Sequence, residues 1–84
     1  MSPLSRYLED EQRRYQMISI RITQTQKEIN RLEGLEEDEI NLAAREDLKL
    51  AVSRAALIQL RLIQRHTADH IRRLYARIRM YDYG

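Results

Sequence analysis

A single glycine, Gly34, interrupts the chain between its only proline, Pro3, and its last residue. Glycine and proline are the strongest breakers of regular structure, and β-rich folds need turn residues about every 8–12 positions. A chain of 84 residues with one internal break is therefore incompatible with an all-β domain. It predicts a single all-α domain over residues 1–84, an antiparallel helical hairpin with helices over 3–33 and 42–81 and a turn over 34–41.

The first predicted helix carries a heptad pattern, which is typical of coiled coils. Positions 4, 8, 11, 15, 18, 22, 25, 29 and 32 alternate at spacings of four and three, and all but two of them are apolar. We expect Ser2 to cap this helix and Gly34 to end it in a left-handed conformation. Asp38 or Asn41 would cap the second helix.

The second predicted helix is apolar on more than one face. One seam follows positions 44, 48, 51, 55, 58 and 62, and a separate stripe follows positions 50, 57 and 60. Such a helix must be covered on more than one face, and the first helix covers only one. A two-helix hairpin of this size also has too little core to be stable alone. The sequence therefore predicts either self-association or a helical partner protein, and the residues expected to face it are Leu48, Leu50, Val52, Leu57, Leu60, Ile63, Ile71, Leu74 and Ile78.

The register of the hairpin follows from a turn centred near residue 37. It places Tyr15 near Leu60 and Leu8 near Thr67. Because the second helix is the longer one, residues beyond about Arg72 would have no partner within the chain. On this interpretation Leu57→Glu or Leu60→Glu abolishes association and leaves the pairing of the two helices intact.

The charges are distributed unevenly. Acidic residues are concentrated in 33–47, arginines are concentrated in 61–79, and the net charge is only +2. Five arginines share one face of the second helix and are expected to orient an acidic protein partner, unless they form an ordinary solvated face. Phosphate contacts to nucleic acid are the alternative, although the small net charge makes a nucleic acid the less favoured partner. The five residues are Arg54, Arg61, Arg65, Arg72 and Arg79.

Catalytic and ligand-binding functions find little support. The chain has no cysteine, which excludes disulfides and thiolate metal sites. His66 and His70 share a helix face with Asp69, but a catalytic zinc site needs a further ligand and a general base. Two helices do not enclose a substrate pocket. We therefore predict a non-enzymatic chain without metal, cofactor or small-molecule ligand, and the lack of a membrane-spanning or signal segment predicts a cytoplasmic location away from membranes.

The stretches MSPLSRYLED (Met1–Asp10) and DLKLAVSRAALIQLRLIQRH (Asp47–His66) resemble the small two-helix co-chaperones of type III secretion systems. The resemblance implies a hairpin that pairs with a second, helical-repeat chaperone and keeps the needle subunit soluble before export. It also implies a set of partner-facing residues, namely Leu48, Val52, Ala55, Leu57, Leu60 and Ile63. The sequence as a whole predicts a small helical chaperone or adaptor, with a homo-oligomeric coiled-coil bundle or an arginine-rich nucleic-acid-binding protein as alternatives.

Overall fold

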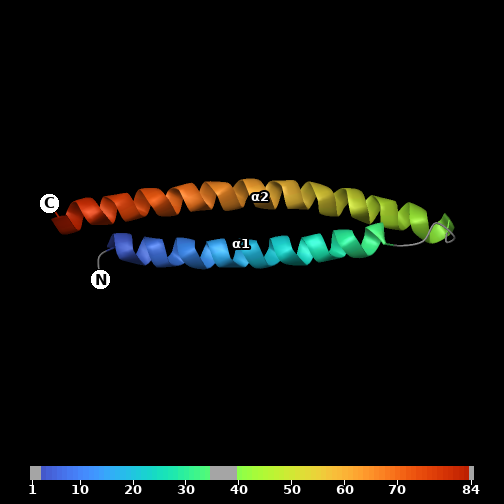
Figure 1. The fold of residues 1–84 in the computed structure, drawn as a ribbon, viewed down its shortest axis with the longest axis horizontal. Coiled ribbons are helices and arrows are strands. Elements are labelled where there is room, and N and C mark those ends of the chain that lie inside the picture. Colours follow the sequence, from blue (N-terminus) through green and yellow to red (C-terminus); the bar gives the residue numbers. More distant parts are fainter. Residues whose placement is uncertain (1–2, 35–39, 84) are drawn as a thin grey trace.

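The computed structural model describes residues 3–34 and 40–83, which form two antiparallel helices (Figure 1). Helix α1 spans Pro3–Glu33 and helix α2 spans Ile40–Tyr83. The hairpin measures 66 × 17 × 15 Å, and its radius of gyration is 19.0 Å, whereas a compact domain of this length has about 12 Å. The predicted all-α hairpin is confirmed, and its extended shape leaves most of both helices open to solvent.

The helix boundaries agree with the prediction to within two residues. Helix α1 ends where expected, while α2 begins two residues earlier and ends two residues later than the predicted range of 42–81. Asn41 therefore lies inside α2, not before its first residue. The predicted caps Ser2 and Asp38 lie outside the described residues.

Gly34 does not adopt the left-handed conformation expected of it. No glycine among the described residues has a positive φ, and the Gly34 N–H donates to the Asn30 carbonyl at 3.1 Å, which continues the helical pattern. A Cβ at this position would lie 3.4 Å from the Asn30 carbonyl oxygen, an ordinary contact distance. The expectation of a left-handed cap was therefore wrong.

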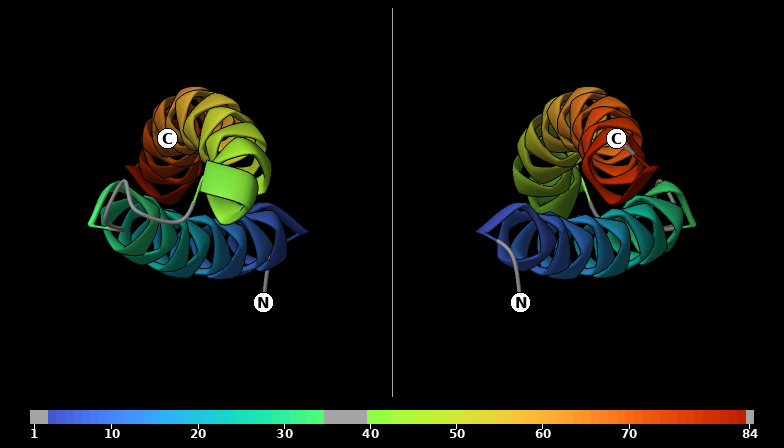
Figure 2. Two further views of the ribbon diagram at one scale, coloured as in Figure 1. Left: turned by 90° about the vertical axis from the view of Figure 1, so that its right-hand side faces the viewer. Right: turned by 90° about the vertical axis from the view of Figure 1, so that its left-hand side faces the viewer.

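The heptad seam of α1 faces α2, as predicted. Ile18, Ile29 and Leu32 are buried, and positions 4, 8, 11, 22 and 25 are half-buried. Seen along the hairpin axis, the two helices wind around each other (Figure 2). A repeat of 3.5 residues on a helix of 3.6 residues per turn produces such winding, because the seam drifts slowly around the helix.

Helix α2 presents a second heptad seam to α1. Leu57, Thr67 and Leu74 are buried, and the positions between and around them, spaced by three and four, are half-buried. We call this the inner seam of α2. It consists of Glu46, Leu50, Ser53, Leu57, Leu60, Gln64, Thr67, Ile71, Leu74 and Ile78.

The register differs from the prediction by about two helical turns. Gln64 Nε2 donates to Ser19 Oγ at 3.0 Å, and Gln12 Nε2 donates to Tyr75 Oη at 2.9 Å. The predicted register would have placed Gln64 near residue 11. It would have placed Tyr75 beyond the first residue of α1, where it has no facing residue. The beginning of α2 lies past the end of α1 in Figure 1, so the hairpin is not centred on residue 37. For the same reason, α2 stays paired with α1 well beyond Arg72, contrary to the prediction.

Candidate functional site

The side of α2 that faces away from α1 carries an uncovered apolar stripe. Its members are spaced by three and four residues, like those of the inner seam, but they lie on the opposite side of the helix. Leu48, Ile58 and Leu62 are 68%, 62% and 59% exposed, and the two alanines between them are exposed as well. We call this stripe the outer α2 face, and it consists of Leu48, Ala51, Val52, Ala55, Ile58 and Leu62.

The predicted partner-binding residues divide between the two sides of α2. Leu48, Val52 and Ile63 are exposed and could meet a partner. The other six belong to the inner seam, which faces α1: Leu50, Leu57, Leu60, Ile71, Leu74 and Ile78.

Two consequences follow from this division. A charge at Leu57 cannot leave the hairpin intact, because that side chain is part of its core. Ile58 and Leu62 were absent from the predicted partner surface. They are among the most exposed apolar residues of α2. The signal for both was present in the sequence as the three-and-four spacing that runs from position 44 to position 62.

A shallow groove between the helices extends the apolar surface to one side. Its volume is about 450 Å³. The apolar residues Ala56, Leu60 and Ile63 of α2 line it together with polar residues of α1. The lining residues are Arg21, Gln24, Thr25, Ala56, Gln59, Leu60 and Ile63.

The five arginines predicted to contact a partner are all exposed, but two of them are engaged within the hairpin. Arg54 Nη2 lies 2.9 Å from Glu33 Oε1 across the two helices, and Arg72 Nη2 lies 3.3 Å from Asp69 Oδ1. Within the described part of the chain, Arg61 and Arg65 form no ion pair. By their spacing along α2, Arg54 and Arg61 border one edge of the outer α2 face.

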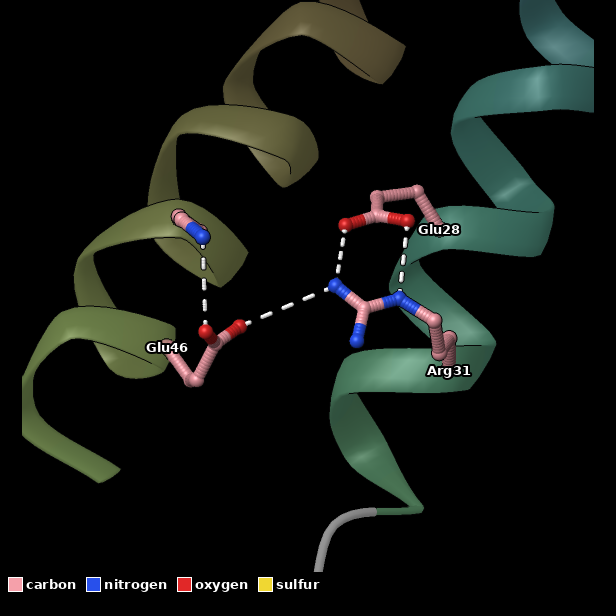
Figure 3. Close-up of polar contacts among 4 residues, drawn as sticks. Glu28, Arg31 and Glu46 are labelled. Atoms are coloured by element: carbon pink, nitrogen blue, oxygen red, sulfur yellow. Dashed lines mark hydrogen bonds and ion pairs between the residues drawn. The ribbon is translucent and has the colours of Figure 1, made fainter. Parts of the chain in front are cut away.

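A charged network ties the end of α1 to the beginning of α2 (Figure 3). The Arg31 guanidinium donates two hydrogen bonds to Glu28, at 2.7 and 3.0 Å, and lies 3.8 Å from Glu46 Oε2. Lys49 Nζ lies 3.4 Å from the other oxygen of Glu46. The hydrogen bonds from Arg31 lower the pKa of Glu28, and the same bonds raise the pKa of Arg31.

This network predicts a dependence of stability on pH. The pKa of Glu28 in the folded chain lies below its ordinary 4.5, so the ionised carboxylate stabilises the hairpin above that pH, and the contribution disappears as the pH falls through the lowered pKa. We expect Arg31→Met to make thermal unfolding less sensitive to acidification below about pH 4.5, and the effect should be small because the pair is exposed to solvent. The control is Arg13→Met, which removes an exposed 4.0 Å contact with Asp10; an equal change in both variants would contradict the expectation.

Of the two histidines, His70 takes part in a contact between the helices. His70 Nδ1 lies 2.9 Å from Glu11 Oε2, while His66 is exposed. In residues 3–34 and 40–83, no group of three or more histidine, aspartate or glutamate side chains is placed to hold a metal ion. Across the same residues, no helix contains a stretch long and apolar enough to cross a membrane.

The sequence matches no known protein family, and no curated protein or solved structure is significantly similar to it. The fold and the surface of the chain therefore carry the functional argument. They define a small, extended helical hairpin with an uncovered apolar face, a class of structure suited to binding a protein partner or to forming an oligomer.

Proposed function

We propose that the chain is a non-catalytic protein–protein interaction module that binds partner helices along the outer α2 face. The observation that carries the proposal is the continuous apolar stripe from Leu48 to Leu62, whose leucine and isoleucine side chains remain more than half exposed. Apolar stripes with this spacing are the usual docking surface for another amphipathic helix. A contiguous exposed apolar patch on a small chain typically marks such a site.

The small core of the hairpin supports the same function. Only five apolar side chains among the described residues are buried, so burial within the chain contributes little against the conformational entropy of 84 residues. Burial of the outer α2 face by a partner would add the missing apolar contacts. In this proposal, binding stabilises the fold as well as providing the function.

Within this class, the resemblance to type III secretion co-chaperones favours a small chaperone or adaptor that shields an apolar helix of its partner in the cytoplasm. Of the partner-facing residues that the resemblance implies, Leu48, Val52, Ala55 and Ile63 are exposed on α2. The others, Leu57 and Leu60, belong to the inner seam. A homo-oligomeric bundle is the alternative, and it would use the same outer α2 face.

Photo-crosslinking in the cells that produce the chain tests the proposal. A photoreactive amino acid in place of Ile58 should give protein adducts, because this position lies on the outer α2 face. The matched control is Ile20, an isoleucine of α1 that is 51% exposed but lies away from the stripe. Adducts from position 58 and not from position 20 would support the proposal. No adduct from position 58, or equal adducts from both positions, would contradict it.

A further inference from the structure

We infer that the occupant of the outer α2 face is a second copy of the chain, packed antiparallel about a two-fold axis close to Ala51 and Ala55. The inference rests on the proposed function, the binding of partner helices along the outer α2 face, and takes its homo-oligomeric form. The two α2 helices would lie side by side at the centre, each with its own α1 on the far side.

The accessible surface of the hairpin is larger than that of a typical folded monomer of its mass, which leaves area for such a partner to cover. It amounts to 7226 Å², whereas a folded monomer of 10.1 kDa exposes about 5,300 Å². The difference exceeds the roughly 800 Å² that each partner buries in a standard interface. The chain therefore exposes more surface than a typical folded monomer of its mass, and four of its exposed large apolar side chains, Leu48, Val52, Ile58 and Leu62, lie on the outer α2 face.

The order of side-chain sizes along the stripe fits an antiparallel pair. Small residues, Ala51 and Ala55, occupy the middle, with Leu48 and Ile58 on either side of them. In an antiparallel pair, Ala51 of one copy meets Ala55 of the other, and Leu48 meets Ile58. Alanines at the centre allow the two helix backbones to approach closely, while the larger side chains close the contact at both ends.

The charges along the edge of the stripe also complement themselves in this arrangement. Asp47 and Arg61 lie on the same edge, both are exposed, and neither forms an ion pair within the described residues. In an antiparallel pair the same edges of the two helices face each other, so Asp47 of each copy lies beside Arg61 of the other. A parallel pair would bring Asp47 beside Val52 and would leave Arg61 without an acidic neighbour.

Arg54 would lie beside its own counterpart near the two-fold axis, where two positive charges would otherwise repel each other. The structure already neutralises this side chain, because Arg54 is paired with Glu33 at 2.9 Å within each hairpin. The ion pair between α1 and α2 thus offsets the repulsion between the two Arg54 side chains in the antiparallel arrangement.

Disulfide trapping tests the arrangement, and the natural chain has no cysteine to interfere. Two variants, Ala51→Cys and Ala55→Cys, are mixed in a glutathione buffer, and the linked products are separated by mass. We expect the mixed 51–55 dimer to exceed each self-linked dimer about tenfold, because only this pair approaches within disulfide distance. Ile20→Cys on α1 is the control and should remain unlinked. Predominant 51–51 and 55–55 products would indicate a parallel pair and overturn the inference.

Charge exchange provides a second measurement. We expect Asp47→Arg and Arg61→Asp each to raise the dissociation constant of the dimer about tenfold, since each affects two contacts related by symmetry. The double variant should return to within about threefold of the natural chain. If the losses of affinity in the two single variants instead add up in the double variant, the proposed register is overturned.

The solution mass of the natural chain separates the two proposals. A dimer by light scattering supports the inference. A helical monomer at all concentrations, together with position 58 adducts to a different protein, would overturn the second copy and leave the proposed function standing. A helical monomer without any position 58 adduct would overturn both.

Discussion

Leu57→Asp is expected to unfold the hairpin, whereas Ile58→Asp, one residue further along, is expected to leave it folded and to break its association. Leu57 is 8% exposed in the inner seam, and a carboxylate there would have to be buried without a partner or driven out into water with loss of the packing. The cost, about 3–5 kcal/mol, is comparable to the whole stability of a domain this small. Ile58 points away from α1, so a carboxylate at that position stays hydrated in the single chain.

Circular dichroism and light scattering on the two variants check this prediction together. The expected result is loss of most helical signal for Leu57→Asp, and retention of helical signal with loss of association for Ile58→Asp. A folded Leu57→Asp variant would show that the inner seam is not the core. An Ile58→Asp variant that still associates would show that the outer α2 face is not the contact surface.

Leu74→Ala is expected to have the second largest effect. Leu74 is 5% exposed and belongs to the part of α2 that lies beside the beginning of α1, where Gln12 donates to Tyr75. Truncating a buried leucine costs about 2–4 kcal/mol, because the lost apolar contacts are accompanied by a cavity. Met80→Ala is the matched control, since Met80 lies in the same part of α2 but is 75% exposed.

Urea unfolding of both variants, followed by circular dichroism, measures the difference. The midpoint should fall clearly for Leu74→Ala and stay close to that of the natural chain for Met80→Ala, with similar slopes for both. Equally small effects would mean that the end of α2 is detached from α1, as the register expected from the sequence alone implied.

The sequence predicted the hairpin and the inner face of α1 because both depend on local patterns. A single break at Gly34 separates two helices, and the seam through Ile18 and Ile29 follows from spacing alone. These features need no knowledge of which residues meet across the hairpin.

The faces of α2 could not be assigned in the same way. Both of its seams have heptad spacing, and the inner one includes polar residues such as Ser53, Gln64 and Thr67. Ranking the seams by hydrophobicity therefore does not reveal which one meets α1. The structure shows that Gln64 is accommodated by its hydrogen bond to Ser19, a contact between residues far apart in the sequence that no local pattern contains.

The register was missed for a related reason. It is set by cross-helix contacts such as those of Gln12 with Tyr75 and of Glu33 with Arg54. A shift of two turns preserves a three-and-four pattern almost unchanged. Hydrophobic spacing alone therefore permits several registers.

The placement of α1 on one side of α2 also limits how far an assembly can grow. The surface of α1 opposite its seam exposes two apolar side chains, Met17 and Ile20, among Arg13, Gln24 and Lys27, so it offers a further helix a more polar surface than the outer α2 face does. A helix added to the outer α2 face gives a row of three helices, in which α2 is in the middle and α1 forms one end, a layer exposed to water. Two hairpins joined through α2 would end in such a layer on both sides, so that the row closes at four helices instead of continuing into a filament.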